Sequence, residues 1–297
     1  MKMTKGEKIF NVFNVAFMTV FAVQCLYPFI YTLALSLNDG IDSFRGGIYL
    51  YPRIFTLQNY STIFTDARIL NSLAISVART VLGVVLAVTL SSMFAFALAK
   101  KTLPGRKFFN WFVFIPMYFG GGLIPYFLIC KSLGLVNNFL VYVIPSSIGA
   151  FFILLLRVCF LGMPDSLEES AKIDGAGYMV IFWRIYFPLA LPSLATIALL
   201  AGLGHWNDWF DGTVMVYKSS LWPMQTLLLN ITTGSDLTAF FKDQNLATVN
   251  VINRKIKVTP ESLKSAMLIV TVAPIVMIYP FLQKYFIKGM MIGSIKG

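Results

Sequence analysis

The sequence predicts an all-α membrane protein with six transmembrane helices, organised as a single transmembrane domain over residues 1–297. Hydrophobic residues make up 57% of the chain and charged residues only 12%, about half the share that soluble domains carry. So few charges could not cover a water-exposed surface of this size, and the abundance of apolar side chains excludes a disordered chain. Six long apolar runs account for this composition.

Each apolar run is long enough for a helix to cross a bilayer, which takes about 20 mostly apolar residues. The predicted spans are residues 9–37, 70–99, 108–130, 139–160, 189–210 and 265–287. The runs are continuous rather than short and alternating, which favours helices over barrel strands. Prolines such as Pro116, Pro145 and Pro192 lie within these runs. Neighbouring helices can satisfy the carbonyl groups that proline frees, so we expect kinked helices.

The distribution of Lys and Arg predicts a multi-pass membrane protein with both termini in the cytoplasm, because cytoplasmic loops are enriched in these residues. The short turn between the second and third spans is the strongest indication, since it holds Lys100, Lys101, Arg106 and Lys107. The net charge of +11 therefore indicates orientation in the bilayer rather than nucleic-acid binding. Two external loops, residues 38–69 and 211–264, are long enough to fold into short helices that contact a partner.

The predicted cytoplasmic segment between the fourth and fifth spans, residues 162–188, carries the most informative pattern. Ser166 with Glu169 three residues later predicts a capping box at the start of a helix. Gly175 and Gly177 predict a helix stop or a sharp turn. By itself, this pattern suits an ordinary capped surface helix equally well.

The same segment resembles the EAA signature of the permeases of binding-protein-dependent ABC importers. That signature places Glu-Ala-Ala, Gly, Ile and Leu-Pro at set spacings, and here the matching positions are Glu169-Ser170-Ala171, Gly175, Ile185 and Phe187-Pro188. Ser170 and Phe187 are mild departures from it. The resemblance extends along nearly the whole chain. Residues 174–176 and 184–185 look like the sugar branch, and the closing residues 285–289 look like the second permease subunit of maltose-type importers. Within that branch the sequence is similar to permeases for complex oligosaccharides of the polygalacturonan or alginate kind.

The resemblance implies the type I ABC importer permease fold, with a cytoplasmic coupling helix that docks on an ATPase subunit. The ATPase-coupling residues would be Glu168, Glu169, Ser170, Ala171, Asp174, Gly175, Ile185 and Pro188. In the bacterial plasma (inner) membrane, the chain would move an oligosaccharide, including uronate-containing ones, from an extracytoplasmic solute-binding protein into the cytoplasm. It would pair with a second permease subunit and two ATPase subunits.

This chain itself is expected to be neither an enzyme nor a holder of a cofactor or metal. It has no GxxxxGK[ST] phosphate-binding motif, so ATP and Mg²⁺ would be bound by the partner ATPase subunits. The three cysteines lie in or beside separate apolar stretches and are expected to be core thiols.

Sugar recognition inside the membrane needs aromatic faces and fixed hydrogen-bonding groups. Candidates for the substrate path are Gln24, Tyr27, Arg79, Tyr118, Tyr126, Trp206, Asn207, Asp208 and Trp209. The tryptophans suit an interfacial aromatic belt as well. An intramembrane arginine such as Arg79 needs a partner or a wet cavity. For Arg79 we favour pairing with an acidic residue across the subunit interface over contact with an acidic sugar. Outside the membrane, a small polar stretch could contact the binding protein or only link two helices: Thr232, Thr233, Gly234 and Ser235.

Two other classes of protein compete with this interpretation. An ion-coupled secondary transporter usually places ionisable residues near the bilayer midplane, and the predicted spans are nearly free of acidic groups. A membrane-embedded enzyme would need a convergent catalytic set. The chain has a single histidine, His205, and no nucleophile elbow.

Overall fold

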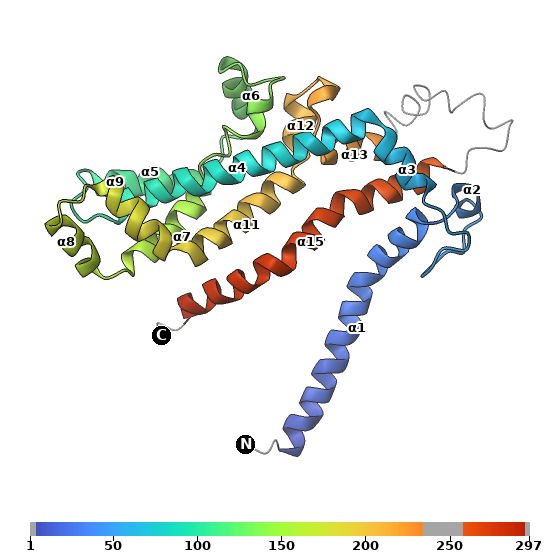
Figure 1. Ribbon diagram of the computed structural model, residues 1–297, viewed down its shortest axis with the longest axis horizontal. Helices are drawn as coiled ribbons and strands as arrows, with labels where there is room; N and C mark the ends of the chain where they lie inside the picture. The colour runs from blue at the N-terminus through green and yellow to red at the C-terminus, as the bar shows by residue number, and fades with distance from the viewer. Residues whose placement is uncertain (1–3, 234–257, 295–297) are drawn as a thin grey trace. The chain divides into compact units, whose positions relative to one another are not determined.

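The computed structural model describes residues 4–233 and 258–294, and within them the chain is helical, with one isolated β-bridge between Asn38 and Phe55 (Figure 1). This confirms the all-α fold class. The chain divides into two compact units. The first comprises Met1–Ile69 and Leu228–Ala273, and the second comprises Leu70–Leu227 and Pro274–Gly297.

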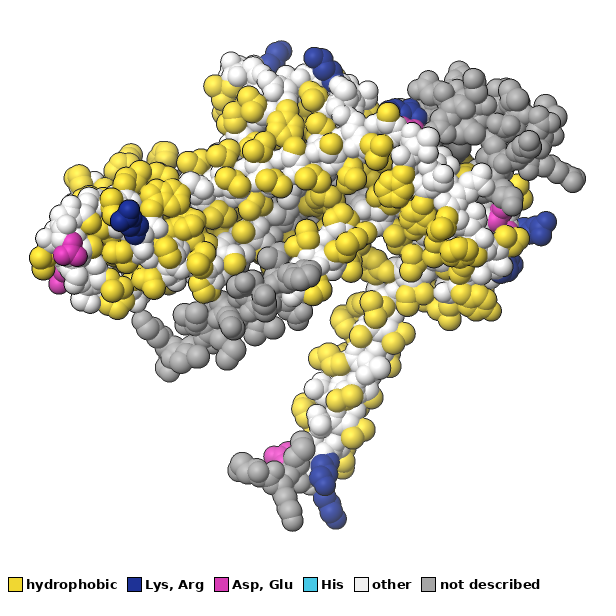
Figure 2. Space-filling model, in the orientation of Figure 1, with side chains coloured by type: hydrophobic (Ala, Val, Ile, Leu, Met, Phe, Trp, Pro, Cys, Tyr) yellow, Lys and Arg dark blue, Asp and Glu magenta, His cyan; other side chains and the backbone are white. Residues whose placement is uncertain are grey.

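The first unit is built around the long helix α1 (Lys5–Ser36). Thr4 and Glu7 form a capping box at its start, with Thr4 accepting from the Glu7 amide and Glu7 accepting from the Thr4 amide. Apart from the half-buried Thr32, its side chains stay exposed until Ala34, and Figure 2 shows hydrophobic side chains along it. A helix that is apolar all round and this exposed suits a lipid environment.

The segment after α1 folds into two short helices, α2 (Gly40–Ser43) and α3 (Gln58–Thr65), as predicted for the loop of residues 38–69. Asn59 in α3 is fully buried. Its amide donates to the Ser36 carbonyl at 2.8 Å, and its side-chain oxygen accepts from the Ser262 hydroxyl at 3.0 Å. This one amide therefore ties α3 to the end of α1 and to the start of α15 (Pro260–Ser294).

The second unit contains the remaining helices. In chain order they are α4 (Ala67–Ala99, beginning in the first unit), α5 (Arg106–Tyr118), α6 (Leu123–Ser132), η1 (Phe139–Tyr142), α7 (Ala150–Leu161), α8 (Asp165–Ile173), α9 (Tyr178–Ile181), η2 (Phe182–Tyr186), α10 (Phe187–Leu189), α11 (Leu191–Asn207), α12 (Phe210–Met215), η3 (Ser219–Leu221) and α13 (Met224–Thr232, which continues into the first unit). η2 is a π-helical turn.

Within the described part of the chain, three helices are long and apolar enough to cross a membrane by themselves: α1, α4 and residues 260–278 of α15. Three further candidates are bent pairs: α5 with α6 at 119°, α7 with α8 at 76°, and residues 178–189 with α11 at 80°. The structure thus has up to six spans, if each bent pair counts as one. The predicted runs 108–130 and 139–160 are each interrupted by non-helical residues, whereas the run 189–210 consists mainly of the single helix α11.

Proline and glycine cause these interruptions. After Pro116, α5 ends, and the glycines at 120–122 include Gly122 with a left-handed φ of 82°. Pro145 lacks an amide hydrogen, and helix resumes only at Ala150. Pro192 lies in the first turn of α11, where its missing amide costs nothing, so a new helix axis begins there.

The main core of the second unit lies where α4, α7, η2 and α11 meet. Phe96 of α4 packs against Phe160 of α7 and Tyr186 of η2, with the Phe96 and Tyr186 ring centroids 4.9 Å apart. Leu156 of α7 and Ile197 of α11 are fully buried in the same cluster. This core holds the ends of α4 and η2 rigidly next to α8.

Candidate functional site

The helix α8 begins at Asp165, directly after Pro164, and no side chain caps it. The predicted capping box of Ser166 with Glu169 is therefore wrong. The helix starts two residues earlier than that box requires, because Pro164 sets a φ of −61° that leads into the first turn. Asp165 and Glu168 lie in this first turn, where the helix dipole favours negative charge.

The end of α8 agrees with the predicted stop. Gly175 has a left-handed φ of 78°, and its amide donates to the Lys172 carbonyl at 3.0 Å. The Ala176 amide donates to the Ala171 carbonyl at 2.9 Å. These two bonds form a Schellman motif, which is why a glycine stands at this position. Gly177 has an ordinary φ of −74° and precedes α9.

The neighbouring acidic residues Glu168 and Glu169 face opposite ways. Glu168 has 13% of its side chain exposed, whereas Glu169 is exposed. Glu168 accepts hydrogen bonds from the Lys100 ammonium, from the Lys172 ammonium at 2.9 Å and from the Tyr186 hydroxyl at 3.0 Å. Glu168 is thus held inside the chain, and Glu169 stays available to a partner.

Burial and charge pairing shape the electrostatics around Glu168. Burial alone would raise the pKa of Glu168, but the hydrogen bonds from Lys100, Lys172 and Tyr186 outweigh it and bring the pKa to about 2. Burial lowers the pKa of Lys100, and its bond to Glu168 opposes that effect. The hydrogen bond to Glu168 raises the pKa of Lys172. Glu168 is therefore ionised at neutral pH.

The outward face of α8 carries a mixed surface that suits docking. Glu169, Ser170, Ile173 and Asp174 are all exposed, and positions four apart lie on one face of a helix. Ile173 is 86% exposed, which is high for an apolar side chain. Ile173 is not among the residues predicted from the sequence, although its place four residues after Glu169 puts it on the same helical face.

The other predicted coupling residues pack inward or lie beyond α8. Ala171 and Ile185 are partly buried and pack against the core around Phe96. Pro188 is exposed in α10, where it stands in the first turn. The segment therefore combines an exposed helical face with an inner face that touches the bundle.

Arg79 has its partner within the same chain. Only 2% of its side chain is exposed, and Nη2 lies 2.5 Å from Oδ2 of Asp208. Nη1 donates to the Asp208 carbonyl at 3.0 Å, and the guanidinium lies 4.5 Å from the centroid of the Tyr142 ring. The predicted pairing across a subunit interface is wrong, because Asp208 ends α11 beside α4 and satisfies the charge locally.

Tyr126 lies near the same cluster, because its hydroxyl donates to Asp211 at 3.4 Å. Asp211 interacts electrostatically with both Asp208 and Arg79. The structure therefore brings three substrate-path candidates together, namely Arg79, Tyr126 and Asp208. Tyr142 and Asp211 complete the cluster. Neither was predicted, because no pattern in the neighbouring sequence indicates that they lie beside Arg79 and Tyr126.

The remaining path candidates are dispersed. Gln24 and Tyr27 are exposed on α1, and Tyr118 is exposed at the end of α5. Asn207 and Trp209 are also exposed, whereas Trp206 is buried. The buried imidazole of His205 packs against Gly83 of α4, which supports a structural role for this histidine.

Of the four residues predicted to contact a binding protein, two are described. The hydroxyls of Thr232 and Thr233 donate to the Leu229 carbonyl at the end of α13, both at 2.9 Å. Gly234 and Ser235 lie outside the described residues.

Residues 3–292 match the family described as "Binding-protein-dependent transport system inner membrane component". The chain belongs to this family. It is 36% identical to Protein LplC of Bacillus subtilis, with 99% of this chain and 97% of LplC covered. It is 35% identical to the polygalacturonan/rhamnogalacturonan transport system permease protein YtcP of the same organism, with 98% and 99% covered.

A solved structure supports the same assignment. The permease is similar to a chain in the crystal structure of a bacterial ABC transporter involved in the import of the acidic polysaccharide alginate. The TM-score is 0.85 at 30% identity, and the match covers 96% of this chain and 99% of that one. The permease therefore has the type I ABC importer fold, is a multi-pass membrane protein and is no enzyme. Family membership decides against the ion-coupled secondary transporter.

Proposed function

We propose that this permease takes a complex oligosaccharide, including uronate-containing chains, from an extracytoplasmic binding protein and passes it into the cytoplasm. The relatives named for polygalacturonan/rhamnogalacturonan and for alginate support this substrate class. Arg79 does not argue for an acidic substrate, because Asp208 already neutralises its guanidinium. Exposed aromatic side chains such as Tyr27, Tyr118 and Trp209 remain the proposed stacking surfaces for sugar rings.

The observation that carries the proposal is the geometry of α8. A short helix with a firm Schellman stop presents Glu169, Ser170, Ile173 and Asp174 outward, while Glu168 anchors its inner side. Such an element can dock in a groove of an ATPase subunit on the cytoplasmic side and move as one body. ATP and Mg²⁺ are bound by two such ATPase subunits, and a second permease subunit completes the membrane pore. Both termini of this chain then lie in the cytoplasm.

The test is ATPase activity of the reconstituted complex with and without the cognate binding protein, across neutral and uronate-containing oligosaccharides. We expect stimulation to require both the binding protein and a uronate-containing chain. If an assembled, ATP-competent complex responds to none of these sugars, the proposed substrate class is wrong.

The docking role of α8 has its own test in Glu169→Lys. This reversal places a positive charge on the outward face, and we expect the ATPase subunit to be lost on purification while the permease still inserts into the membrane. Lys131→Glu reverses another exposed charge, on α6, and serves as the matched control. Normal ATPase binding by Glu169→Lys would contradict docking through this face.

A further inference from the structure

The attachment of α8 to the rest of the second unit rests on very few contacts. None of the nine residues of α8, which all belong to the described part of the chain, is fully buried. The partly buried Ala171 touches the core. The ion pair between Lys172 and Glu168 joins two residues of α8 itself, and the Lys172 ammonium also lies 5.0 Å from the ring centroid of Tyr178 in α9. Two ion pairs therefore remain as links between α8 and the end of α4.

These two links differ sharply in burial. Lys101 pairs with Asp165 at 3.0 Å, but their side chains are 74% and 72% exposed, so water and salt screen the attraction. Lys100 pairs with Glu168, and each side chain is only 13% exposed. The buried Lys100–Glu168 pair is therefore less screened by water and salt, and it fixes the position of α8 relative to the end of α4.

Aromatic rings hold Lys100 in place from the bundle side. Its ammonium lies 4.0 Å from the ring centroid of Phe96 and 4.0 Å from that of Tyr186. The Tyr186 hydroxyl also donates to Glu168 at 3.0 Å. Phe96 and Tyr186 belong to the buried core, so the position of Lys100 follows the position of α4 and η2.

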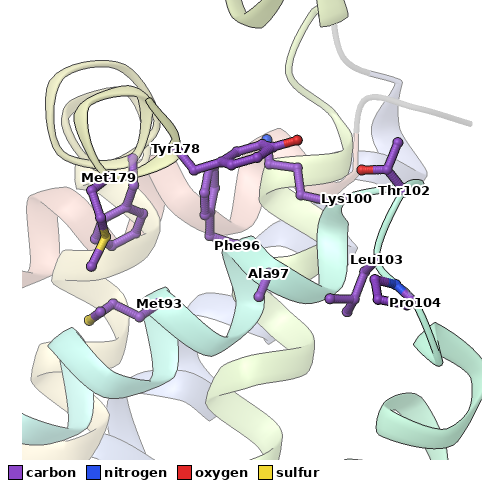
Figure 3. Close-up of a pocket in the computed structure, with 10 residues that line it drawn as sticks. Met93, Phe96, Ala97, Lys100, Thr102, Leu103, Pro104, Tyr178 and Met179 are labelled. Atoms are coloured by element: carbon purple, nitrogen blue, oxygen red, sulfur yellow. The ribbon is translucent and has the colours of Figure 1, made fainter. Parts of the chain in front are cut away.

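Two cavities flank this link. One, of about 370 Å³, is lined mainly by apolar side chains, and Figure 3 shows Lys100 and Phe96 beside Tyr178 at its edge. The other, of about 340 Å³, is lined by residues that include Lys100, Lys101, Asp165, Glu168 and Tyr186. Because side chains do not fill the space around the link, packing alone does not force α8 to follow the bundle.

We propose that Lys100 is the positioning residue through which a push on α8 reaches α4, by way of its buried pair with Glu168. This inference rests on the proposed docking of α8 on an ATPase subunit. In this arrangement, an ATPase that shifts α8 pulls Glu168, and the ion pair passes the displacement to Lys100 and so to the end of α4. The exposed pair of Lys101 with Asp165 carries none of it.

The experiment compares Lys100→Met with Lys101→Met, which removes the neighbouring charge at an exposed site. Lys100→Arg keeps the charge and the stacking on the rings, so it serves as the conservative variant. The position of α8 is measured directly by electron-electron resonance between spin labels at Val85→Cys on α4 and Ile173→Cys on α8. Both sites are exposed, and the full-length chain is studied in nanodiscs after replacement of Cys25, Cys130 and Cys159 by Ala. Coupling is measured without labels, as ATPase stimulation by the sugar-loaded binding protein in the assembled complex.

We expect Lys100→Met to broaden the label distance distribution and to lower ATPase stimulation by about tenfold, within the range usual for coupling between sites. Basal ATPase activity and complex assembly should remain at the wild-type level. Lys101→Met should match the wild type, and Lys100→Arg should restore both measurements. A purely structural defect would lower assembly and all activities together.

The inference is overturned if Lys100→Met matches Lys101→Met in either measurement. If Lys100→Met fails to fold, the same comparison is made from the α8 side, with Glu168→Gln as the test and Asp165→Asn as its control. Glu168→Gln should then show the loss of stimulation and the broadened distances, and Asp165→Asn should match the wild type. Failure of the proposed function looks different. The wild-type chain would then bind no ATPase subunit, whereas the label distances would still report the link between Lys100 and Glu168.

Discussion

Replacing Asp208 by Asn tests whether the buried pair with Arg79 holds α11 against α4. The variant keeps the size of the side chain and removes its charge, so Arg79 stays in a site where 2% of its side chain is exposed. Breaking a buried pair from one side costs about 3–5 kcal/mol. Asp208 is 27% exposed, and its carbonyl still accepts from Arg79 at 3.0 Å, so the lower end of that range applies.

We therefore expect Asp208→Asn to destabilise the protein by about 3 kcal/mol. For a chain of this size that loss lowers Tm by about 6–12 °C. Tryptophan fluorescence during heating of the detergent-solubilised permease measures the shift. Asp165→Asn is the matched control, because it removes the same charge from an exposed ion pair and should leave Tm unchanged.

The double variant with Arg79→Met and Asp208→Asn separates lost pairing from a stranded charge. Once the guanidinium is gone, no buried charge is left without a partner, so the double variant should be more stable than Asp208→Asn alone. A Tm for Asp208→Asn within about 2 °C of the Asp165→Asn control would refute the reasoning. Additive losses in the double variant would do the same.

Three further predictions concern the end of α8, the contact of Gly83 with His205, and the titration of one buried carboxyl. Gly175→Ala should cost about 1 kcal/mol, because φ is 78° there, and should speed hydrogen exchange in α8, whereas Gly177→Ala at φ −74° should not. Gly83→Ala should cost about 1–3 kcal/mol and lower Tm, because its methyl group would displace the buried His205 imidazole. Glu168 has a pKa of about 2 against an ordinary value of 4.5, so its contribution is complete above pH 4.5 and is lost as the pH falls toward 2. The gap between the two pKa values corresponds to about 3 kcal/mol of stability. The free energy of unfolding, measured between pH 5 and pH 3, should show part of this loss in the wild type but not in Glu168→Gln.

Controls make each of these outcomes decisive. Gly202→Ala adds a methyl group at an ordinary contact distance of 3.5 Å from Val84, so it should be tolerated where Gly83→Ala is not. Equal exchange rates in Gly175→Ala and Gly177→Ala would argue against the Schellman stop. Equal pH dependence in the wild type and Glu168→Gln would show that other carboxyls cause the loss.

Much of this protein follows from local sequence patterns. The 57% hydrophobic composition requires a membrane environment, and long apolar runs specify where the helices α1, α4 and α15 lie. Gly175 specifies the end of α8, because a left-handed backbone conformation costs glycine nothing. The spacing of Glu169, Gly175 and Ile185 identified the family. Each of these signals depends on residues within a few turns of one another.

The structure decided what depends on residues far apart in the chain. Arg79 and Asp208 lie 129 residues apart, and no local pattern shows that α11 ends beside α4. Glu168 and Glu169 are the same residue type at adjacent positions. Packing alone turns one toward Lys100, 68 residues away, and leaves the other exposed. The bend angles of the broken spans depend on which neighbouring helix satisfies the freed carbonyl groups. Prolines and glycines in the sequence therefore indicated where the helices break, but not the angle between the two parts. A helix is set by contacts along the chain, whereas an ion pair between helices is set by how the helices pack.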